Sequence, residues 1–209
     1  MLTLYDCATA PSPRRARILL AEKGVTHHTV QVDLRNGEQL GEAYRKINPQ
    51  CTVPALVTEE GPVLTDNAAI AAYVEASIPE PPLLGRTSLD KAEIASWQWR
   101  VEFEGLLAIA DAFRNSSPAM ANRALTGPVD YAQIPELAQR GLARVNAFFA
   151  MLDAHLADRE FIAAGQFSIA DITAVVAVDF ARVVKVKPGD EHPHLRRWRE
   201  AMQARGTMG

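Results

Sequence analysis

The sequence predicts an α/β domain over residues 1–78, a linker over residues 79–88 and an all-helical domain over residues 89–209. Before the linker, short alternating runs that are typical of strands interleave with helical patterns. After the linker, apolar residues recur almost entirely at helical spacing. The linker holds three prolines within residues 79–82, which cannot continue a helix because proline lacks an N–H group. The predicted fold class is therefore α/β plus all-α.

The first domain is expected to run in the order β-α-β-α-β-β-α. Pro13 suits the first turn of a helix, and Gly24 suits the residue after its end. A Thr-Glu-Glu-Gly stretch at residues 58–61 separates two short apolar runs, which is typical of a β-hairpin. The expected strands lie at residues 1–5, 28–32, 54–57 and 62–64, and the expected helices lie at residues 13–22, 38–46 and 67–76.

The second domain is expected to be a helical bundle. Its helices are predicted at residues 89–113, 135–156, 169–184 and 195–204, with a loop at residues 115–134. The third of these segments is apolar nearly all round, so we expect it at the centre of the bundle.

The composition excludes several classes of protein and partner. Of the 209 residues, 48% are hydrophobic and 22% are charged, which excludes a disordered chain and collagen. The formal net charge is −3, so no basic field favours nucleic acid as a partner. No apolar run approaches the ~20 residues that a membrane-spanning helix needs, so we expect no membrane partner.

The N-terminus lacks the basic and apolar regions of a signal peptide. Cys7 and Cys51 are the only cysteines, and they form neither a CxxC pair nor a metal-spaced set with histidines. We therefore expect a cytoplasmic protein without a metal site.

Four stretches carry motifs in a fixed order. Residues 48–56 read N-P-Q-C-T-V-P-A-L, residues 64–70 read L-T-D-N-A-A-I, residues 167–172 read F-S-I-A-D-I and residues 193–198 read P-H-L-R-R-W. In order and spacing they resemble the motifs of the cytosolic glutathione transferases. The resemblance spans nearly the whole chain and implies a thioredoxin-like N-terminal domain followed by a helical bundle. It also implies glutathione as co-substrate and a homodimer.

The first two motifs imply a glutathione site through this resemblance. In the family, the backbone at the position of Val53 pairs with the cysteinyl part of glutathione, and Pro54 follows a cis peptide bond. Asp66 is expected to face the γ-glutamyl ammonium group. Asn67 replaces the family's serine and is expected to donate to the γ-glutamyl carboxylate. A structural alternative stays open, in which Val53-Pro54 starts a strand and Asp66-Asn67 caps a helix.

The thiol-activating position is where the chain departs from the family, which places a serine, cysteine or tyrosine there. Aligning Arg15 and Arg17 with the family's R-x-R motif puts Ala10 at this position. Thr9 and Ser12 flank it and are the candidates for stabilising the thiolate. Ser12 also fits a helix N-cap before a proline, and backbone N–H groups are a further option.

The third motif is expected to have a structural role. Ser168 and Asp171 have the spacing of a capping box, with the acidic residue at the third helical position. No histidine is placed to complete a hydrolase triad, so we expect a cap for the helix that follows.

The helical domain is expected to supply the pocket for a small, largely apolar electrophile. Phe103, Leu107 and Asp111 are the candidate pocket residues on its first helix. The resemblance implies that the thiolate of glutathione attacks this electrophile, which is the chemistry of detoxification.

Two other functions stay open. If Cys7 or Cys51 is reactive, the protein is a glutathione-dependent thiol reductase or isomerase that forms a mixed disulfide. If Ala10 marks a lost activity, the protein is a non-catalytic glutathione-binding module.

Overall fold

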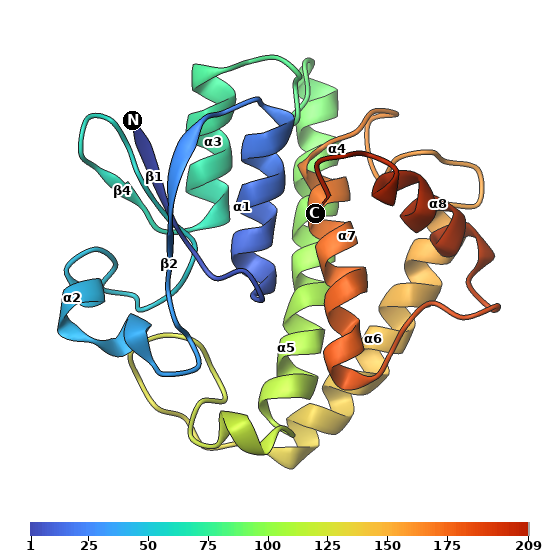
Figure 1. Cartoon of the computed structure of the whole chain (residues 1–209). Coiled ribbons are helices and arrows are strands. Elements are labelled where there is room, and N and C mark those ends of the chain that lie inside the picture. Colours follow the sequence, from blue (N-terminus) through green and yellow to red (C-terminus); the bar gives the residue numbers. More distant parts are fainter. Residues whose placement is uncertain (209) are drawn as a thin grey trace. The chain divides into compact units, whose positions relative to one another are not determined.

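The computed structural model describes residues 1–208, which form two compact units (Figure 1). The first unit contains Met1–Pro81 and Leu125–Asp130, and the second contains Pro82–Ala124 and the chain from Tyr131 onward. Part of the segment that was expected to be a loop of the helical domain therefore belongs to the first unit.

The first unit has the predicted order of strands and helices, and its fold class is confirmed. Its helix α1 begins two residues earlier than expected, and the second predicted helix consists of a 3₁₀ turn and one short α-helix. The elements are β1 (Leu2–Asp6), α1 (Pro11–Glu22), β2 (His27–Gln31), a 3₁₀ helix (Glu38–Leu40), α2 (Glu42–Arg45), β3 (Ala55–Val57), β4 (Val63–Leu64) and α3 (Asn67–Ser77).

The four strands form one mixed sheet in the order β2-β1-β3-β4. Strand β1 runs parallel to β2 and antiparallel to β3, and β3 pairs antiparallel with β4. In the parallel pair, Asp6 at the end of β1 stands opposite Gln31 at the end of β2. The register therefore places these two residues side by side at the C-terminal ends of the paired strands.

Helices α1 and α3 lie side by side and share a core with the sheet (Figure 1). Leu4, Ile18, Leu56 and Ile70 are fully buried there. The C-terminal ends of the two helices are tied together by Lys23, whose buried ammonium group donates to the Ile78 carbonyl at 2.7 Å and pairs with Glu75.

The second unit is helical, as predicted, and its first long helix, expected at residues 89–113, contains a π-helical segment between two α-helical ones. The elements are α4 (Ser88–Arg100), a π-helix (Val101–Leu106), α5 (Leu107–Arg114), a 3₁₀ helix (Pro118–Met120), α6 (Pro135–His155), α7 (Ile169–Phe180), a 3₁₀ helix (Ala181–Val184) and α8 (Pro193–Gln203). The π-helical segment contains Gly105, against which the ring of Phe148 packs so closely that a Cβ atom would lie 2.6 Å from it.

Helix α7 lies in the core of this unit, as its apolar sequence predicted. Its residues Ile169–Val178 are all buried, and it packs against α4 and the π-helical segment. Within residues 1–208, no helix combines the length and the apolar character that crossing a membrane requires.

The predicted capping box at the start of α7 is confirmed. The Ser168 hydroxyl accepts from the Ala170 N–H at 3.3 Å, and the Asp171 carboxylate accepts from the Ser168 N–H at 3.0 Å. The same carboxylate accepts from the Ile162 N–H at 2.9 Å and from the Trp198 indole at 3.3 Å. Burial raises the pKa of Asp171 to about 6, against the effect of these donors.

Candidate functional site

The Val53–Pro54 peptide bond is cis, and the loop before it is fixed by buried polar groups. The Thr52 carbonyl accepts from the Asn48 amide and from the Tyr44 hydroxyl, each at 2.7 Å. Val53 is 9% exposed and packs beside Tyr44. The pairing of β3 with β1 starts at residue 55, so the Val53 backbone lies outside the sheet ladder. The Val53 backbone therefore takes no part in the strand pairing of the sheet.

Asp66 and Asn67 lie at the N-terminus of α3. Asp66 is the N-cap, since its Oδ1 accepts from the Ala69 N–H at 2.8 Å, and its side chain is exposed. Asn67 is the first residue of the helix and is only 8% exposed. The first N–H groups of a helix have no partner within the helix, so this terminus is suited to an anion.

Asn67 is tied to the first turn of α1. Its Nδ2 donates to the Ser12 Oγ at 2.9 Å and to the Ser12 carbonyl at 3.2 Å. Its Oδ1 is buried and has no hydrogen-bond partner within residues 1–208. The amide group that was expected to be available for a carboxylate thus joins α1 to α3 in this structure.

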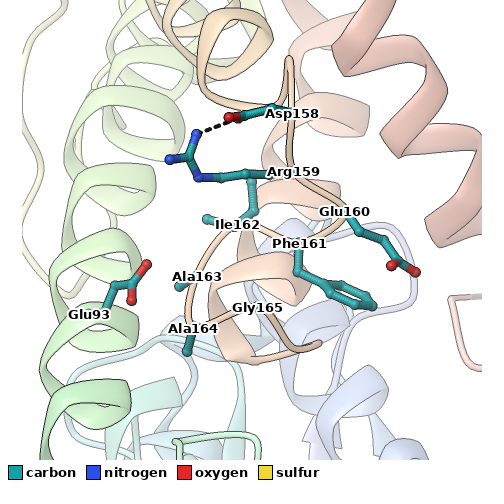
Figure 2. A pocket seen from close by; sticks show the side chains of 9 residues that line it. All are labelled: Glu93, Asp158, Arg159, Glu160, Phe161, Ile162, Ala163, Ala164 and Gly165. Carbon is teal, nitrogen blue, oxygen red and sulfur yellow. Dashed lines mark hydrogen bonds and ion pairs between the residues drawn. The ribbon is translucent and has the colours of Figure 1, made fainter.

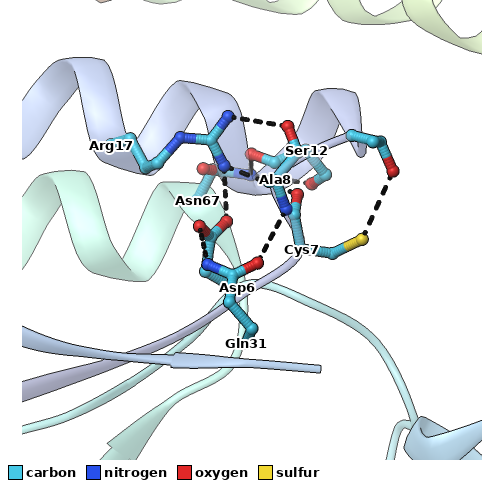
Figure 3. Close-up of polar contacts among 8 residues, drawn as sticks. Asp6, Cys7, Ala8, Ser12, Arg17, Gln31 and Asn67 are labelled. Atoms are coloured by element: carbon cyan, nitrogen blue, oxygen red, sulfur yellow. Dashed lines mark hydrogen bonds and ion pairs between the residues drawn. The ribbon is translucent and has the colours of Figure 1, made fainter. Parts of the chain in front are cut away.

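The interpretation of Ser12 as a helix N-cap is wrong. Helix α1 begins at Pro11, which takes the first helical position because its missing N–H needs no partner there. The N-cap is Ala10, and Ser12 is the second residue of the helix. The Ser12 Oγ accepts from Asn67 (Figure 3). It also accepts from Arg15 at 3.3 Å.

Between β1 and α1 the chain makes a tight turn. The Ala10 N–H donates to the Cys7 carbonyl at 3.0 Å and closes the turn. The Ala8 N–H donates to the Gln31 Oε1 at 3.0 Å. Both N–H groups therefore have partners. The side chain of Thr9, between them, is exposed and carries the hydroxyl of the turn. Its Oγ1 lies 3.6 Å from the Cys7 Sγ.

Below this turn lies a buried carboxylate that the sequence analysis did not assign. The Asp6 side chain is 2% exposed and accepts from Arg17 and from Gln31 (Figure 3). The same Arg17 donates to the Ala8 carbonyl at 3.2 Å. An aspartate at the end of a buried strand, followed by an arginine in the next helix, is the signal that could have identified this pair.

Both cysteines are free thiols. Cys7 is partly buried at the turn, and Cys51 is 3% exposed with its thiol 3.6 Å from the Pro49 carbonyl. Only Cys7 therefore lies among the residues of the β1–α1 turn.

In the second unit, Phe103, Leu107 and Asp111 follow one another along the π-helical segment and α5. Phe103 is 41% exposed and stacks on Trp99 with ring centroids 4.9 Å apart. Leu107 is 42% exposed. The guanidinium of Arg144 lies 4.7 Å from the centre of the Phe103 ring and 3.8 Å from the Asp111 carboxylate.

A polar pocket of the same unit lies elsewhere. It is lined by Glu93 of α4 and residues 158–165, which follow α6 (Figure 2). Arg159 points toward Asp158 at its rim, and their charged groups are 2.8 Å apart. None of the three candidate pocket residues lines it.

Both units match known protein domains. Residues 9–77 match the glutathione S-transferase N-terminal domain, and residues 117–205 match the glutathione S-transferase C-terminal domain. The chain is 31% identical over 210 aligned residues to glutathione S-transferase 2 of Saccharomyces cerevisiae, covering 99% of this chain and 88% of that protein.

Solved structures resemble the chain over its whole length. The crystal structure of Gtt2 from Saccharomyces cerevisiae matches with a TM-score of 0.89 and 31% identity, covering 99% of this chain and 98% of the other. A glutathione S-transferase domain-containing protein of Marinobacter aquaeolei matches with a TM-score of 0.88 and 31% identity, covering 99% and 100%.

Proposed function

Since the chain belongs to the glutathione S-transferase family, we propose that it transfers the thiolate of glutathione to a small, largely apolar electrophile. Its full-length relatives are glutathione S-transferases, so its activity is that of a glutathione transferase. The residues that bind glutathione, the residue that activates its thiol and the chemical nature of the electrophile are our proposals.

The observation that carries the binding proposal is the place of the Val53 backbone, just before the start of β3. The Val53 backbone lies beyond the sheet ladder, which begins at residue 55. A peptide ligand can therefore pair with it as an added strand. We assign the cysteinyl part of glutathione to this edge.

The γ-glutamyl end is assigned to the N-terminus of α3. One oxygen of Asp66 caps the helix by accepting from Ala69, and its side chain is exposed, so an ammonium group can reach the carboxylate. The first N–H groups of α3 are suited to the γ-glutamyl carboxylate. Asn67 lines this position, and its bond to Ser12 holds its side chain in place.

Thiol activation is assigned to Thr9. A free thiol with a pKa of ~8.5 is mostly protonated at neutral pH, and a donor to the sulfur lowers this pKa. Thr9 carries an exposed hydroxyl at the β1–α1 turn, where the Ala8 and Ala10 N–H groups already have partners. Ser12 is occupied with Asn67, so its assigned role is to position that side chain.

The reaction then needs no further cofactor. The thiol proton passes to solvent, and the sulfur forms a bond to the electrophilic carbon. A leaving group such as chloride departs with its electron pair. We assign the apolar contact with the electrophile to Phe103 and Leu107, whose side chains are both partly exposed, and a polar contact to Asp111.

We further propose a cytoplasmic homodimer that acts in detoxification. These expectations follow from the family resemblance. Light scattering at assay concentrations measures the oligomeric state. A mass of twice 22.8 kDa is the expected result, and a monomer contradicts the proposal.

The function is tested by calorimetric titration with glutathione, followed by turnover of a chlorodinitrobenzene. We expect saturable binding, and release of chloride with formation of the S-aryl conjugate. Absence of binding contradicts the proposal. Binding without turnover of any electrophile identifies a non-catalytic glutathione-binding module.

A thiol reductase is the second candidate, because Cys7 lies in the β1–α1 turn with its Sγ 3.6 Å from the Thr9 hydroxyl. Cys7→Ser separates the two functions. Under the transferase proposal, conjugation persists in this variant. If the wild-type protein reduces disulfides with glutathione but does not conjugate, and Cys7→Ser loses this reduction, the reductase is favoured.

A further inference from the structure

The Asp6 carboxylate joins three elements of the first unit. It lies at the end of β1, is 2% exposed and has both oxygens bonded (Figure 3). Arg17 of α1 donates to Oδ1, and Gln31 at the end of β2 donates to Oδ2 at 2.8 Å. The parallel register places Gln31 directly opposite Asp6. A buried carboxylate with these partners holds both side chains in fixed orientations.

The same guanidinium and amide groups also bind the backbone of Ala8. Arg17 donates to the Ala8 carbonyl at 3.2 Å, and the Gln31 Oε1 accepts from the Ala8 N–H at 3.0 Å. A second contact from Arg17 reaches the Cys7 carbonyl at 3.5 Å. The exposed β1–α1 turn is therefore tied to a buried carboxylate through two side chains.

We propose that Asp6, Gln31 and Arg17 are positioning residues for thiol activation, because they fix the turn that carries Thr9. This inference rests on the proposed function of Thr9. None of the three residues is assigned a contact with the sulfur. A hydrogen bond weakens steeply with distance and angle, so a hydroxyl on a fixed turn stabilises the thiolate better than one on a mobile turn.

The network also explains why Arg17 is not assigned as the thiol-activating cation. Its guanidinium is paired with Asp6, whose side chain is buried beneath the turn. Replacing Asp6 leaves the charge of Arg17 without its carboxylate, which lowers the thiol pKa. It also releases the turn, which raises the thiol pKa, so the two effects oppose each other. Gln31 offers a cleaner test, because its side chain is uncharged and belongs to an exposed residue.

The test uses Gln31→Met, which preserves the length of the side chain and removes its bonds to Ala8 and Asp6. The pKa of bound glutathione is measured by the ultraviolet absorbance of its thiolate in the binary complex, so no electrophile is needed. We expect this pKa to rise by roughly 0.5 to 1, with glutathione affinity nearly unchanged. Conjugation below that pKa then falls roughly 3- to 10-fold.

Gln166→Met is the matched control, since Gln166 makes one comparable bond, to the Pro82 carbonyl at 2.9 Å, in the other unit. It is expected to leave the thiol pKa unchanged. The double variant Thr9→Val with Gln31→Met is expected to have the same thiol pKa as Thr9→Val alone, because Gln31 acts through Thr9.

The outcomes separate this inference from the function on which it rests. If Thr9→Val raises the thiol pKa and Gln31→Met does not, the positioning role is overturned and the assignment of Thr9 stands. If the thiol pKa of the double variant exceeds that of Thr9→Val by the full effect of Gln31→Met, Gln31 does not act through Thr9 and the positioning role is overturned. If Thr9→Val leaves the pKa unchanged, the assignment of Thr9 fails, and the positioning role fails with it.

Discussion

Two hydroxyl groups flank Ala10, and their hydrogen bonds give them different roles at the residue scale. The Ser12 hydroxyl accepts from Asn67 and Arg15 and joins two helices. The Thr9 hydroxyl is exposed on a turn in which the Ala8 and Ala10 N–H groups have partners. The sequence does not distinguish the two residues, because distance along the chain does not show that Ser12 bonds to another helix and Thr9 to the neighbouring Cys7.

Asp66→Asn separates the cap of α3 from its charge. Asparagine caps a helix about as well as aspartate, so the thermal midpoint is expected to stay nearly constant. A charge-assisted hydrogen bond contributes about 1.5–3 kcal/mol, so glutathione affinity is expected to fall by roughly 10- to 100-fold in a calorimetric titration. Asp90→Asn, at the capping box of α4, is the control and should not alter affinity. Equal affinity for Asp66→Asn and wild type would contradict the assigned contact.

At the scale of elements, close helix contacts depend on glycine. Helix α6 crosses α5 at Gly141, where a Cβ atom would lie 2.6 Å from the Ala112 nitrogen and 2.7 Å from the Ala108 oxygen. Backbone atoms at this distance cannot move away from an added Cβ atom by a change of rotamer, as a flexible side chain can. The crossing therefore holds α5, which carries Leu107 and Asp111, at a fixed separation from α6.

Gly141→Ala is expected to destabilise the protein although alanine favours helix. The overpacking cost is about 1–3 kcal/mol or more against backbone, while the helix propensity gained is about 1 kcal/mol. Urea unfolding measures the difference. Gly206→Ala is the control, because within residues 1–208 no atom beyond its own chain neighbours lies within 4 Å of its Cβ position. If Gly141→Ala is as stable as wild type, the close crossing of α5 and α6 is wrong.

The order of elements could be predicted, whereas several details within them could not. Strand and helix periodicity is local, so the β-α-β-α-β-β-α order and the capping box at Ser168 follow from short stretches. The π-helical segment at Val101–Leu106 lies within the helix expected at residues 89–113, and the sequence pattern did not distinguish it from the α-helical turns on either side. The bond of Asp6 to Gln31 joins residues that lie on different strands, and only the sheet register reveals it.

At the scale of the whole molecule, the buried Asp171 makes stability depend on pH. Burial raises its pKa from 3.8 to about 6 in the folded protein. Between these values the folded protein binds more protons than the unfolded chain, so stability falls as pH rises through this window. The contribution is fully present below about pH 3.8 and is lost above about pH 6.

The variant Asp171→Asn isolates this contribution, because it removes the titrating group. The difference in unfolding free energy between wild type and variant is expected to change by on the order of 2–3 kcal/mol between pH 4 and pH 7, with wild type losing stability relative to the variant. Urea unfolding at several pH values measures this difference. A difference that does not vary with pH would contradict the raised pKa.

The assignment of residues 125–130 to the first unit also belongs to this scale. Gly127 is buried beside the Gln50 carbonyl, more than 70 residues earlier in the chain. A contact between such distant segments leaves no periodic signal, so the sequence predicted only a loop of the helical domain there.

The central claim is that Thr9 lowers the pKa of the glutathione thiol, and the thiolate absorbance of the binary complex tests it most directly. Thr9→Ser keeps the hydroxyl and is expected to match the wild-type thiol pKa. Thr9→Val removes it and is expected to raise that pKa by about 1, toward the value of free glutathione. An identical thiol pKa in wild type and Thr9→Val would contradict the account.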